Sequence, residues 1–174
     1  VEDDPKFNLF RDKLSNRFFD KTINPSGKLV LFSESVDTLN YLYDRLTKEI
    51  GRTDVLLVTA ANRKRVGDTI KKNFDANHDV LEDEFNIIIT SDVLAEGVNL
   101  HRSNVIVNYD SPWNATRLMQ RIGRVNRIGS VAPNIYNYMF YPSQQGDKEI
   151  KLYKNALVKL QGFHSAFGED AQIY

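Results

Sequence analysis

The segment TRLMQRIGRVNRIG, residues 116–129, holds the side chains whose types and spacing best suit chemistry. On a helix, Arg117, Arg121 and Arg124 recur at steps of four and three, with Gln120 and Arg127 beside them. Apolar residues fall on another face of the same helix: Leu118, Ile122 and Val125. The pattern therefore predicts a helix with a polar, cationic face and an apolar back.

An arginine cluster of this kind suits the binding of an anion. The planar guanidinium matches phosphate oxygens, and its charge does not titrate away near neutral pH. Gly123 inside the helix costs about 1 kcal/mol relative to alanine, which indicates that backbone or a ligand comes close there. A solvated basic helix face explains the charges alone equally well.

The elements that must position this helix alternate along the chain. Apolar runs of strand length occupy residues 28–33, 55–59, 86–91, 104–110 and 134–141. Stretches with helical spacing lie at about residues 4–20, 36–50, 62–74, 92–98, 114–127 and 147–160. This alternation predicts an α/β fold, in which helices cover both faces of a mostly parallel central sheet. We expect one domain over residues 1–174, because 41% hydrophobic residues can supply a single core.

Composition excludes several kinds of site. Lysine plus arginine (23) equals aspartate plus glutamate (23), so any contact with nucleic acid must be local. The chain has no cysteine, and its three histidines are far apart in sequence, so we expect no structural metal. The apolar runs are too short to cross a bilayer, so we expect no membrane contact and a cytoplasmic location. The start at Val1 suggests part of a longer protein.

Hydroxyl side chains stand at the ends of predicted strands. In open parallel sheets, ligands gather at the carboxyl ends of the strands, where Thr90 and Ser91 are expected. Gly97, a few residues later, could let backbone approach a ligand. The plainer alternative is an ordinary turn from strand to helix, with Ser91 as the helix N-cap.

These segments together resemble the second RecA-like lobe of superfamily 2 helicases and translocases. QRIGRVNRIG resembles motif VI, whose pattern is QxxGRxxR, and its RIG ending is similar to the Swi/Snf-type ATPases and their bacterial relatives. IIITSDVLAEGVNL resembles motif V, KLVLFS resembles motif IV, and NYDSPWN resembles the stretch between motifs V and VI in the Swi/Snf-like group. The resemblance implies a RecA-like three-layer sandwich.

The resemblance also implies roles at an ATP site shared between two lobes. Arg124 and Arg127 would be arginine fingers, which stabilise the negative charge that develops on the transferred phosphoryl group. Gln120 would face the nucleotide or the cleft between the lobes, and Gly97 and Asn99 would lie near the ribose. Arg121 occupies a variable place in the Swi/Snf-like pattern and receives no role.

The nucleic-acid track implied by the resemblance follows the strand ends. Its expected contacts are Ser33, Thr59, Arg63, Thr90 and Ser91. Each has a plainer interpretation as a helix cap, a core residue or a solvated helix start. Glu96 departs from the arginine of DEAD-box relatives, which argues against an identical mechanism, and Trp113 is better explained as a packing residue than as a base-stacking platform.

The chain lacks the parts that would bind ATP on its own. No GxxxxGK motif followed by Ser or Thr occurs, and EDEF at residues 82–85 precedes a strand instead of following one. ATP and Mg²⁺ would therefore be bound mainly by a first RecA-like lobe that is absent, and the chain alone should be inactive. DNA is the expected nucleic acid, with RNA not excluded.

Two other classes of protein remain open on the sequence. One is a non-catalytic nucleic-acid-binding or regulatory module that keeps a RecA-like fold. The other is an unrelated α/β domain whose arginine helix binds a phosphorylated small molecule. The second would place Arg124 beside a deep closed pocket, whereas a motor lobe presents its arginines on an open face.

Overall fold

The computed structural model describes residues 4–95, 98–112 and 114–141, so the helix expected at about residues 147–160 lies outside it. The strands are β1 (Leu29–Phe32), β2 (Val55–Val58), β3 (Ile87–Thr90), β4 (Val105–Asn108) and β5 (Tyr136–Met139). The α-helices are α1 (Pro5–Lys13), α2 (Val36–Asp44), α3 (Gly67–Phe74) and α4 (Ala115–Val125). Turns of π-helix extend α1 (η1, Leu14–Phe18) and α2 (η2, Arg45–Glu49), and a 3₁₀ turn follows β3 (η3, Asp92–Ala95).

Short polar side chains set where three of the helices begin. The Asp4 carboxylate accepts hydrogen bonds from the backbone N–H groups of Lys6 and Phe7, at 3.0 and 3.1 Å. Ser35 accepts from the first turn of α2, and Asn114 from the first turn of α4. Each of these caps satisfies a backbone donor that has no partner inside its helix, and so fixes the first turn.

The third helix is shorter than its sequence predicts. A helix was expected over residues 62–74, but α3 begins only at Gly67, and residues 60–66 form turns. The Asn62 side chain explains the difference, since its amide oxygen accepts from the Thr59 N–H and its amide nitrogen donates to the Leu57 carbonyl. These bonds offer the backbone an alternative to helix, which is the usual reason that asparagine favours turns.

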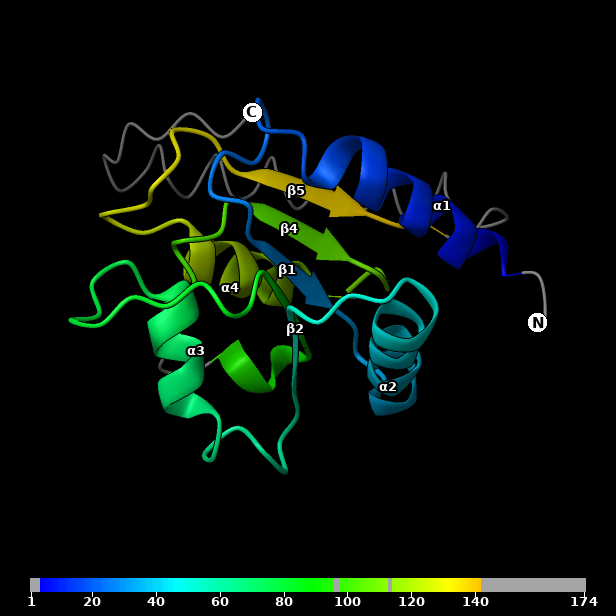
Figure 1. Ribbon diagram of the computed structural model, residues 1–174, viewed down its shortest axis with the longest axis horizontal. Helices are drawn as coiled ribbons and strands as arrows, with labels where there is room; N and C mark the ends of the chain where they lie inside the picture. Colours follow the sequence, from blue (N-terminus) through cyan, green and yellow to red (C-terminus); the bar gives the residue numbers. More distant parts are fainter. Residues whose placement is uncertain (1–3, 96–97, 113, 142–174) are drawn as a thin grey trace.

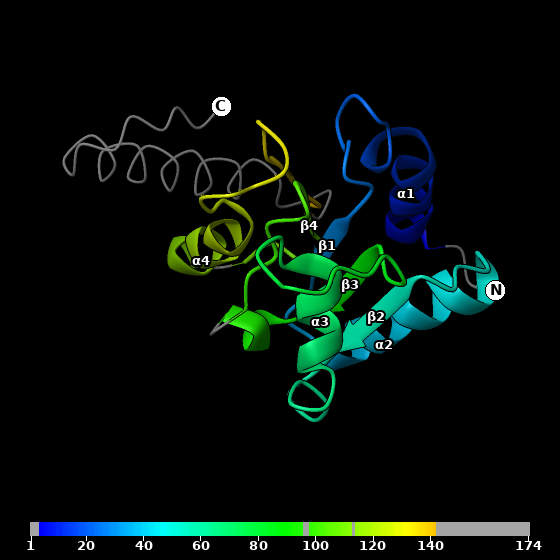
Figure 2. The ribbon, with the colours of Figure 1, turned by 60° about the vertical axis from the view of Figure 1, so that its left-hand side comes forward.

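All five strands are parallel and lie in the order β2, β3, β1, β4, β5 (Figure 1). The first strand is central, with β3 on one side and β4 on the other. Helices α1 and α2 cover one face of the sheet, and α3 and α4 cover the other (Figure 2). The three-layer α/β arrangement predicted from the alternation of strands and helices is therefore confirmed.

Strands β1 to β4 bury residues on both faces of the sheet, whereas the edge strand β5 is only half-buried. In β1, Leu29 and Leu31 point to the face covered by α1 and α2, whereas Val30 and Phe32 point to the face covered by α3 and α4. All four residues are buried. This explains why the strands read as continuous apolar runs without alternation, as expected for a parallel sheet between two layers of helices.

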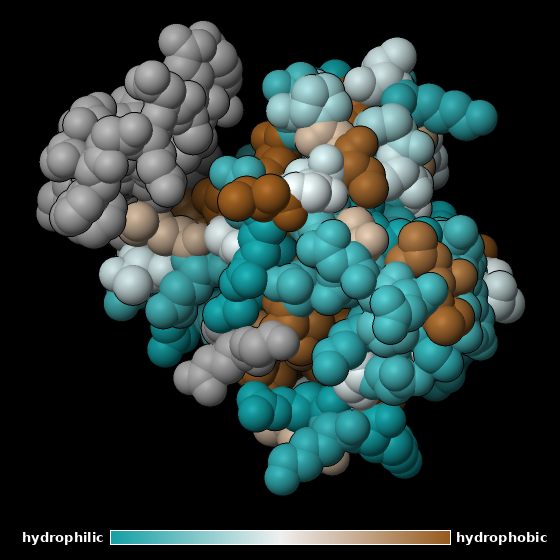
Figure 3. Space-filling view, turned by 90° about the vertical axis from the view of Figure 1, so that its left-hand side faces the viewer, coloured by the Kyte–Doolittle hydropathy of each residue, from teal (hydrophilic) through white to brown (hydrophobic). Residues whose placement is uncertain are grey.

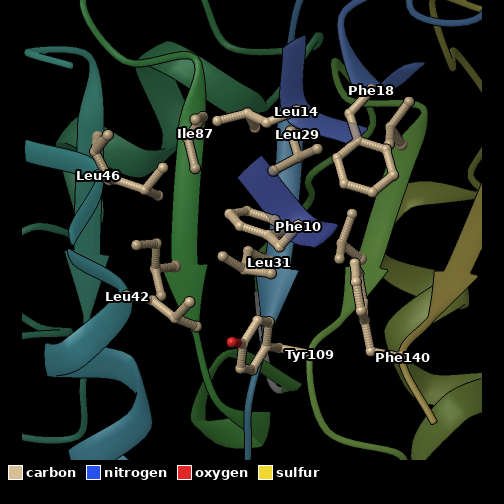
Figure 4. Close-up of a cluster of buried hydrophobic side chains, with 14 of the residues drawn as sticks. Phe10, Leu14, Phe18, Leu29, Leu31, Leu42, Leu46, Ile87, Tyr109 and Phe140 are labelled. Atoms are coloured by element: carbon tan, nitrogen blue, oxygen red, sulfur yellow. The ribbon is translucent and has the colours of Figure 1, made fainter. Parts of the chain in front are cut away.

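The N-terminal helix joins distant parts of the chain through aromatic contacts. The Phe10 ring meets the rings of Tyr109 and Phe140 edge-on, with centroids 5.9 and 6.1 Å apart. Phe10 lies at the centre of the cluster drawn in Figure 4 and is fully buried. Helix α1 thus covers the face of the sheet at the ends of β4 and β5, where Tyr109 and Phe140 lie. No helix among the described residues is long and apolar enough to cross a membrane.

Replacing Phe10 with alanine should lower the free energy of unfolding by about 3–5 kcal/mol, because it leaves a cavity in this cluster. The neighbouring Leu9 is 50% exposed, so Leu9→Ala should cost no more than about 0.5 kcal/mol. Urea denaturation of both variants measures the difference. Equal losses would contradict the placement of α1 on the sheet.

Candidate functional site

Helix α4 carries the arginine segment and runs against the direction of the strands. It follows the carboxyl end of β4 and leads to the amino end of β5, and these two strands are parallel. Its first turn therefore lies at the carboxyl edge of the sheet and its last turn at the amino edge. Because a helix rises about 1.5 Å per residue, Arg117 and the last helical residue, Val125, are roughly 12 Å apart along its axis.

Arg121 holds this helix to the sheet. Its side chain is fully buried and makes two hydrogen bonds to the Asp92 carboxylate, at 2.6 and 2.9 Å. A third bond joins its guanidinium to the amide oxygen of Asn108 at 2.9 Å, and the group lies 4.8 Å from the centre of the Phe32 ring. The polar fork is thus satisfied in a site that excludes water, which is the condition for a stable buried charge.

This burial corrects the helical face predicted from the sequence. Arg121 was grouped with Arg117 and Arg124 on one solvated cationic face, whereas the structure turns it inward beside the apolar Val125. The pattern of charges gave no sign of this, because a buried arginine and an exposed one have the same spacing. The available signal was Asp92, an acidic residue placed directly after a buried strand.

An open hollow of about 460 Å³ lies at the carboxyl edge of the sheet. We call it the strand-end hollow, and its lining residues are Glu34, Arg63, Ser91, Asp92, Val93, Arg117 and Gln120. Arg63 is steadied there by a hydrogen bond from its guanidinium to the Val93 carbonyl, at 3.0 Å. The Ser91 hydroxyl accepts from the Val93 N–H at 3.4 Å, so its own hydrogen is left to donate.

The predicted nucleic-acid contacts do not all lie in this hollow. Arg63 and Ser91 line it, together with Gln120, which the sequence assigned to the nucleotide. Ser33 and Thr90 are fully buried, with the Ser33 hydroxyl donating to Asp110 and that of Thr90 to the Ser91 carbonyl. Buried side chains can meet a nucleic-acid strand only after rearrangement, and Thr59 is outside the hollow. All five nucleic-acid contacts, including Arg63 and Ser91, stay predictions.

A second open hollow, of about 490 Å³, lies where α4 ends. We call it the helix-end hollow, and it is lined by Asn77, Asn99, His101, Gly123, Asn126, Arg127 and Ile128. The exposed Arg127 bends back so that its guanidinium donates to the Gly123 carbonyl at 3.1 Å. Two predicted nucleotide contacts, Asn99 and Arg127, thus share this hollow. Gly97 lies outside the described residues.

Polar and apolar residues are mixed at this end of the molecule (Figure 3). Figure 3 views it from the amino ends of the strands, and hydrophilic residues separate its apolar areas. Arg124 is partly buried, and its carbonyl accepts from the Leu100 N–H at 2.9 Å. Gly123 has no heavy atom within 4 Å of the place where a Cβ would stand. The close backbone approach considered for this glycine is therefore not found among the described residues.

His101 is a buried base without a hydrogen-bond partner. Neither ring nitrogen is bonded to any group in the described part of the chain. Burial lowers the pKa of this imidazole, and the nearby Arg127 lowers it further, while Asp75, 3.7 Å away, opposes the shift. His101 is therefore neutral at pH 7, and its one donor and one acceptor lie buried beneath the helix-end hollow, where they could reach a ligand only after rearrangement. Sequence reasoning considered the histidines as metal ligands and gave His101 no role.

The described residues contain no group of three His, Cys, Asp or Glu side chains that could hold a metal ion. Guanidinium, amide, hydroxyl and imidazole groups line the two hollows and suit phosphate and sugar oxygens, while the carboxylates of Glu34 and Asp92 in the strand-end hollow pair with arginines. Both hollows are open, in contrast to the closed pocket that a small-molecule site would require.

Comparison with known proteins agrees with this geometry. Residues 6–129 match the helicase conserved C-terminal domain. The chain belongs to this family. Among solved structures, the C-terminal part of the Fun30 ATPase domain has a TM-score of 0.64 and 18% identity, covering 84% of this chain and 44% of that one. The RecA-like α/β fold of a helicase C-terminal domain, expected from motifs V and VI, is confirmed.

Curated relatives of this helicase domain are much longer than the chain. The uncharacterized ATP-dependent helicase YqhH of Bacillus subtilis is 42% identical over 60 residues, which are 34% of this chain and 11% of that protein. The ATP-dependent RNA helicase sub2 of Aspergillus terreus is 26% identical over 164 residues, which are 87% of this chain and 34% of that protein. The chain thus spans about a tenth to a third of these relatives.

Replacing Arg121 with alanine should destabilise the helicase domain by about 3 kcal/mol, because Asp92 and Asn108 lose their buried partner. Arg117 is the matched control, since its side chain is 52% exposed and Arg117→Ala should cost less than about 1 kcal/mol. Urea denaturation compares the two variants. Similar small losses would show that Arg121 does not anchor α4.

His101 should make stability depend on pH. Its folded-state pKa lies below the unfolded value of about 6.5, so the unfolded chain takes up the proton first and stability falls as pH drops below about 6.5. His101→Gln should therefore reduce the stability difference between pH 7 and pH 5. Thermal unfolding at both pH values tests this, and an unchanged difference would refute the shift.

Proposed function

We propose that this helicase domain is the second motor lobe of an ATP-dependent translocase that acts on nucleic acid. The observation that carries the proposal is the set of positions on α4. Arg124 and Arg127 lie on its last turns and beyond, with Arg127 exposed at the helix-end hollow, while Gln120 and Arg117 line the strand-end hollow. One helix thereby serves two polar sites.

The helix-end hollow suits the nucleotide. Arg124 and Arg127 would supply positive charge to the phosphoryl group transferred from ATP, and Asn99 and Gly97 would lie near the ribose. The exposed side chain of Arg127 makes a single hydrogen bond among the described residues, to a backbone carbonyl, and can exchange it for a phosphate at little cost. ATP and Mg²⁺ would be held mainly by a first RecA-like lobe in the same protein, whose closure against this lobe completes the site.

The strand-end hollow suits the backbone of a nucleic acid. Arg63 and the Ser91 hydroxyl lie together in it, at the edge of the sheet where parallel strands present ligands. Ser33, Thr59 and Thr90 extend the proposed track along the ends of neighbouring strands. Phosphate contacts of this kind position a strand without reading its sequence, and they suit a motor that moves along any sequence.

We propose duplex DNA as the track, on the Swi/Snf-like features RIG and NYDSPWN. Several relatives are named RNA helicases, which favours RNA as the second candidate. ATPase activity measured with duplex DNA and with duplex RNA distinguishes these two candidates. A non-catalytic module remains the alternative to a motor. The following experiment distinguishes these two functions.

In the full-length protein that contains this chain, Arg124→Ala and Arg127→Ala should each lower the DNA-stimulated ATPase kcat about 10³-fold, because a finger stabilises the transition state. The KM for ATP should change much less. Lys48→Ala is the control, since Lys48 is exposed and pairs only with Asp44 among the described residues. The 174-residue chain alone should show no turnover. Unchanged kcat in both arginine variants would leave the non-catalytic module as the better explanation.

A further inference from the structure

Arg117 is a cation that lines the strand-end hollow and to which the family resemblance assigns no role. It stands in the first turns of α4 with 52% of its side chain exposed. Its guanidinium lies 3.2 Å from the Glu34 carboxylate and 3.7 Å from that of Asp92. Glu34 follows directly after Ser33 at the carboxyl end of β1, so this ion pair bridges the central strand and the arginine helix.

Positive charge exceeds negative charge in the strand-end hollow once Asp92 is assigned to Arg121. Asp92 is committed to the buried Arg121 through two hydrogen bonds, so its contact with Arg117 is secondary. Two guanidiniums, those of Arg63 and Arg117, then face one uncommitted carboxylate, that of Glu34. The lining therefore favours a further anion, and the Ser91 hydroxyl and Gln120 amide beside it add uncharged donors.

Replacing the Arg117–Glu34 ion pair by an Arg117–phosphate contact should cost little free energy. Ion pairs between exposed side chains contribute little to stability, because water and salt screen both partners. A phosphate oxygen offers the planar guanidinium the same two-point geometry as a carboxylate. A phosphate that reaches the hollow also meets Arg63, with which Glu34 forms no ion pair among the described residues. The phosphate therefore gains a second cation in the exchange.

We propose that Arg117 is a phosphate-binding residue of the nucleic-acid track and that Glu34 competes with the phosphate for it. The inference rests on the proposed function, since it assumes that the strand-end hollow carries the track. Glu34 occupies Arg117 when the track is empty and is displaced when a backbone phosphate enters. The carboxylate thus weakens binding and shortens the residence of each phosphate, as a translocating motor requires.

The two partners make opposite predictions, which separates competition from simple support. Binding of a fluorescein-labelled duplex DNA to the full-length protein is followed by fluorescence anisotropy without nucleotide, over a range of salt concentrations. Arg117→Ala should weaken binding several-fold and reduce the salt slope by about 1. Glu34→Gln should strengthen binding by up to about fivefold, the factor expected from removing an exposed ion pair. Lys48→Ala should do neither.

The double variant and Arg63→Ala make the outcome decisive. If Glu34 acts only through Arg117, adding Glu34→Gln to Arg117→Ala should have much less effect than in the wild type. Weaker binding in Arg63→Ala, with no change in Arg117→Ala or Glu34→Gln, would overturn this inference and leave the proposed function standing. No change in any of the variants would count against both. Thermal unfolding of each variant confirms that it is folded.

Discussion

The buried bond between Arg121 and Asp92 is the constraint on which the functional face of this domain depends. It joins α4 to the turn after β3, and its third hydrogen bond reaches Asn108 at the end of β4. Three segments far apart in sequence are therefore fixed relative to one another by one side chain. The directional bonds of the guanidinium fork act together with the buried Leu118 and Val125 to set the rotation of α4 about its axis. That rotation decides which side chains reach each hollow.

The second consequence of this anchor is that the two hollows cannot move independently. Gln120 directly precedes Arg121 and lines the strand-end hollow, while Gly123 lies two residues after it and lines the helix-end hollow. A shift of α4 that improves one hollow changes the other. In a two-lobed motor, such rigidity offers a physical route by which occupancy of a nucleic-acid track and of a nucleotide site could influence each other.

Sequence reasoning predicted the architecture better than the site. Continuous apolar runs such as LVLF and IIIT indicated strands covered on both faces, and the structure confirms them because burial follows directly from residue type. The start of α3 was wrong, since the competing bonds of Asn62 depend on side-chain geometry. Three features could not be predicted from the sequence, because each depends on residues that meet only after the chain folds. They are the burial of Arg121, the lack of a described hydrogen-bond partner for His101, and the Arg117–Glu34 ion pair. The motif resemblance singled out the arginines of α4, but it did not indicate that Arg117 and Arg127 line different hollows.

The central place of β1 has a consequence for how the chain reaches this fold. Its partners, β3 and β4, lie far later in the sequence, so no hydrogen-bonded neighbour exists when β1 is made. Pairings over such long stretches of chain are slow, because the loss of loop entropy precedes the gain from contact. Until β3 and β4 emerge from the ribosome, the segment LVLF has two unpaired edges and two apolar faces. The strand that organises the finished sheet is thus the part of the nascent chain most in need of protection from aggregation.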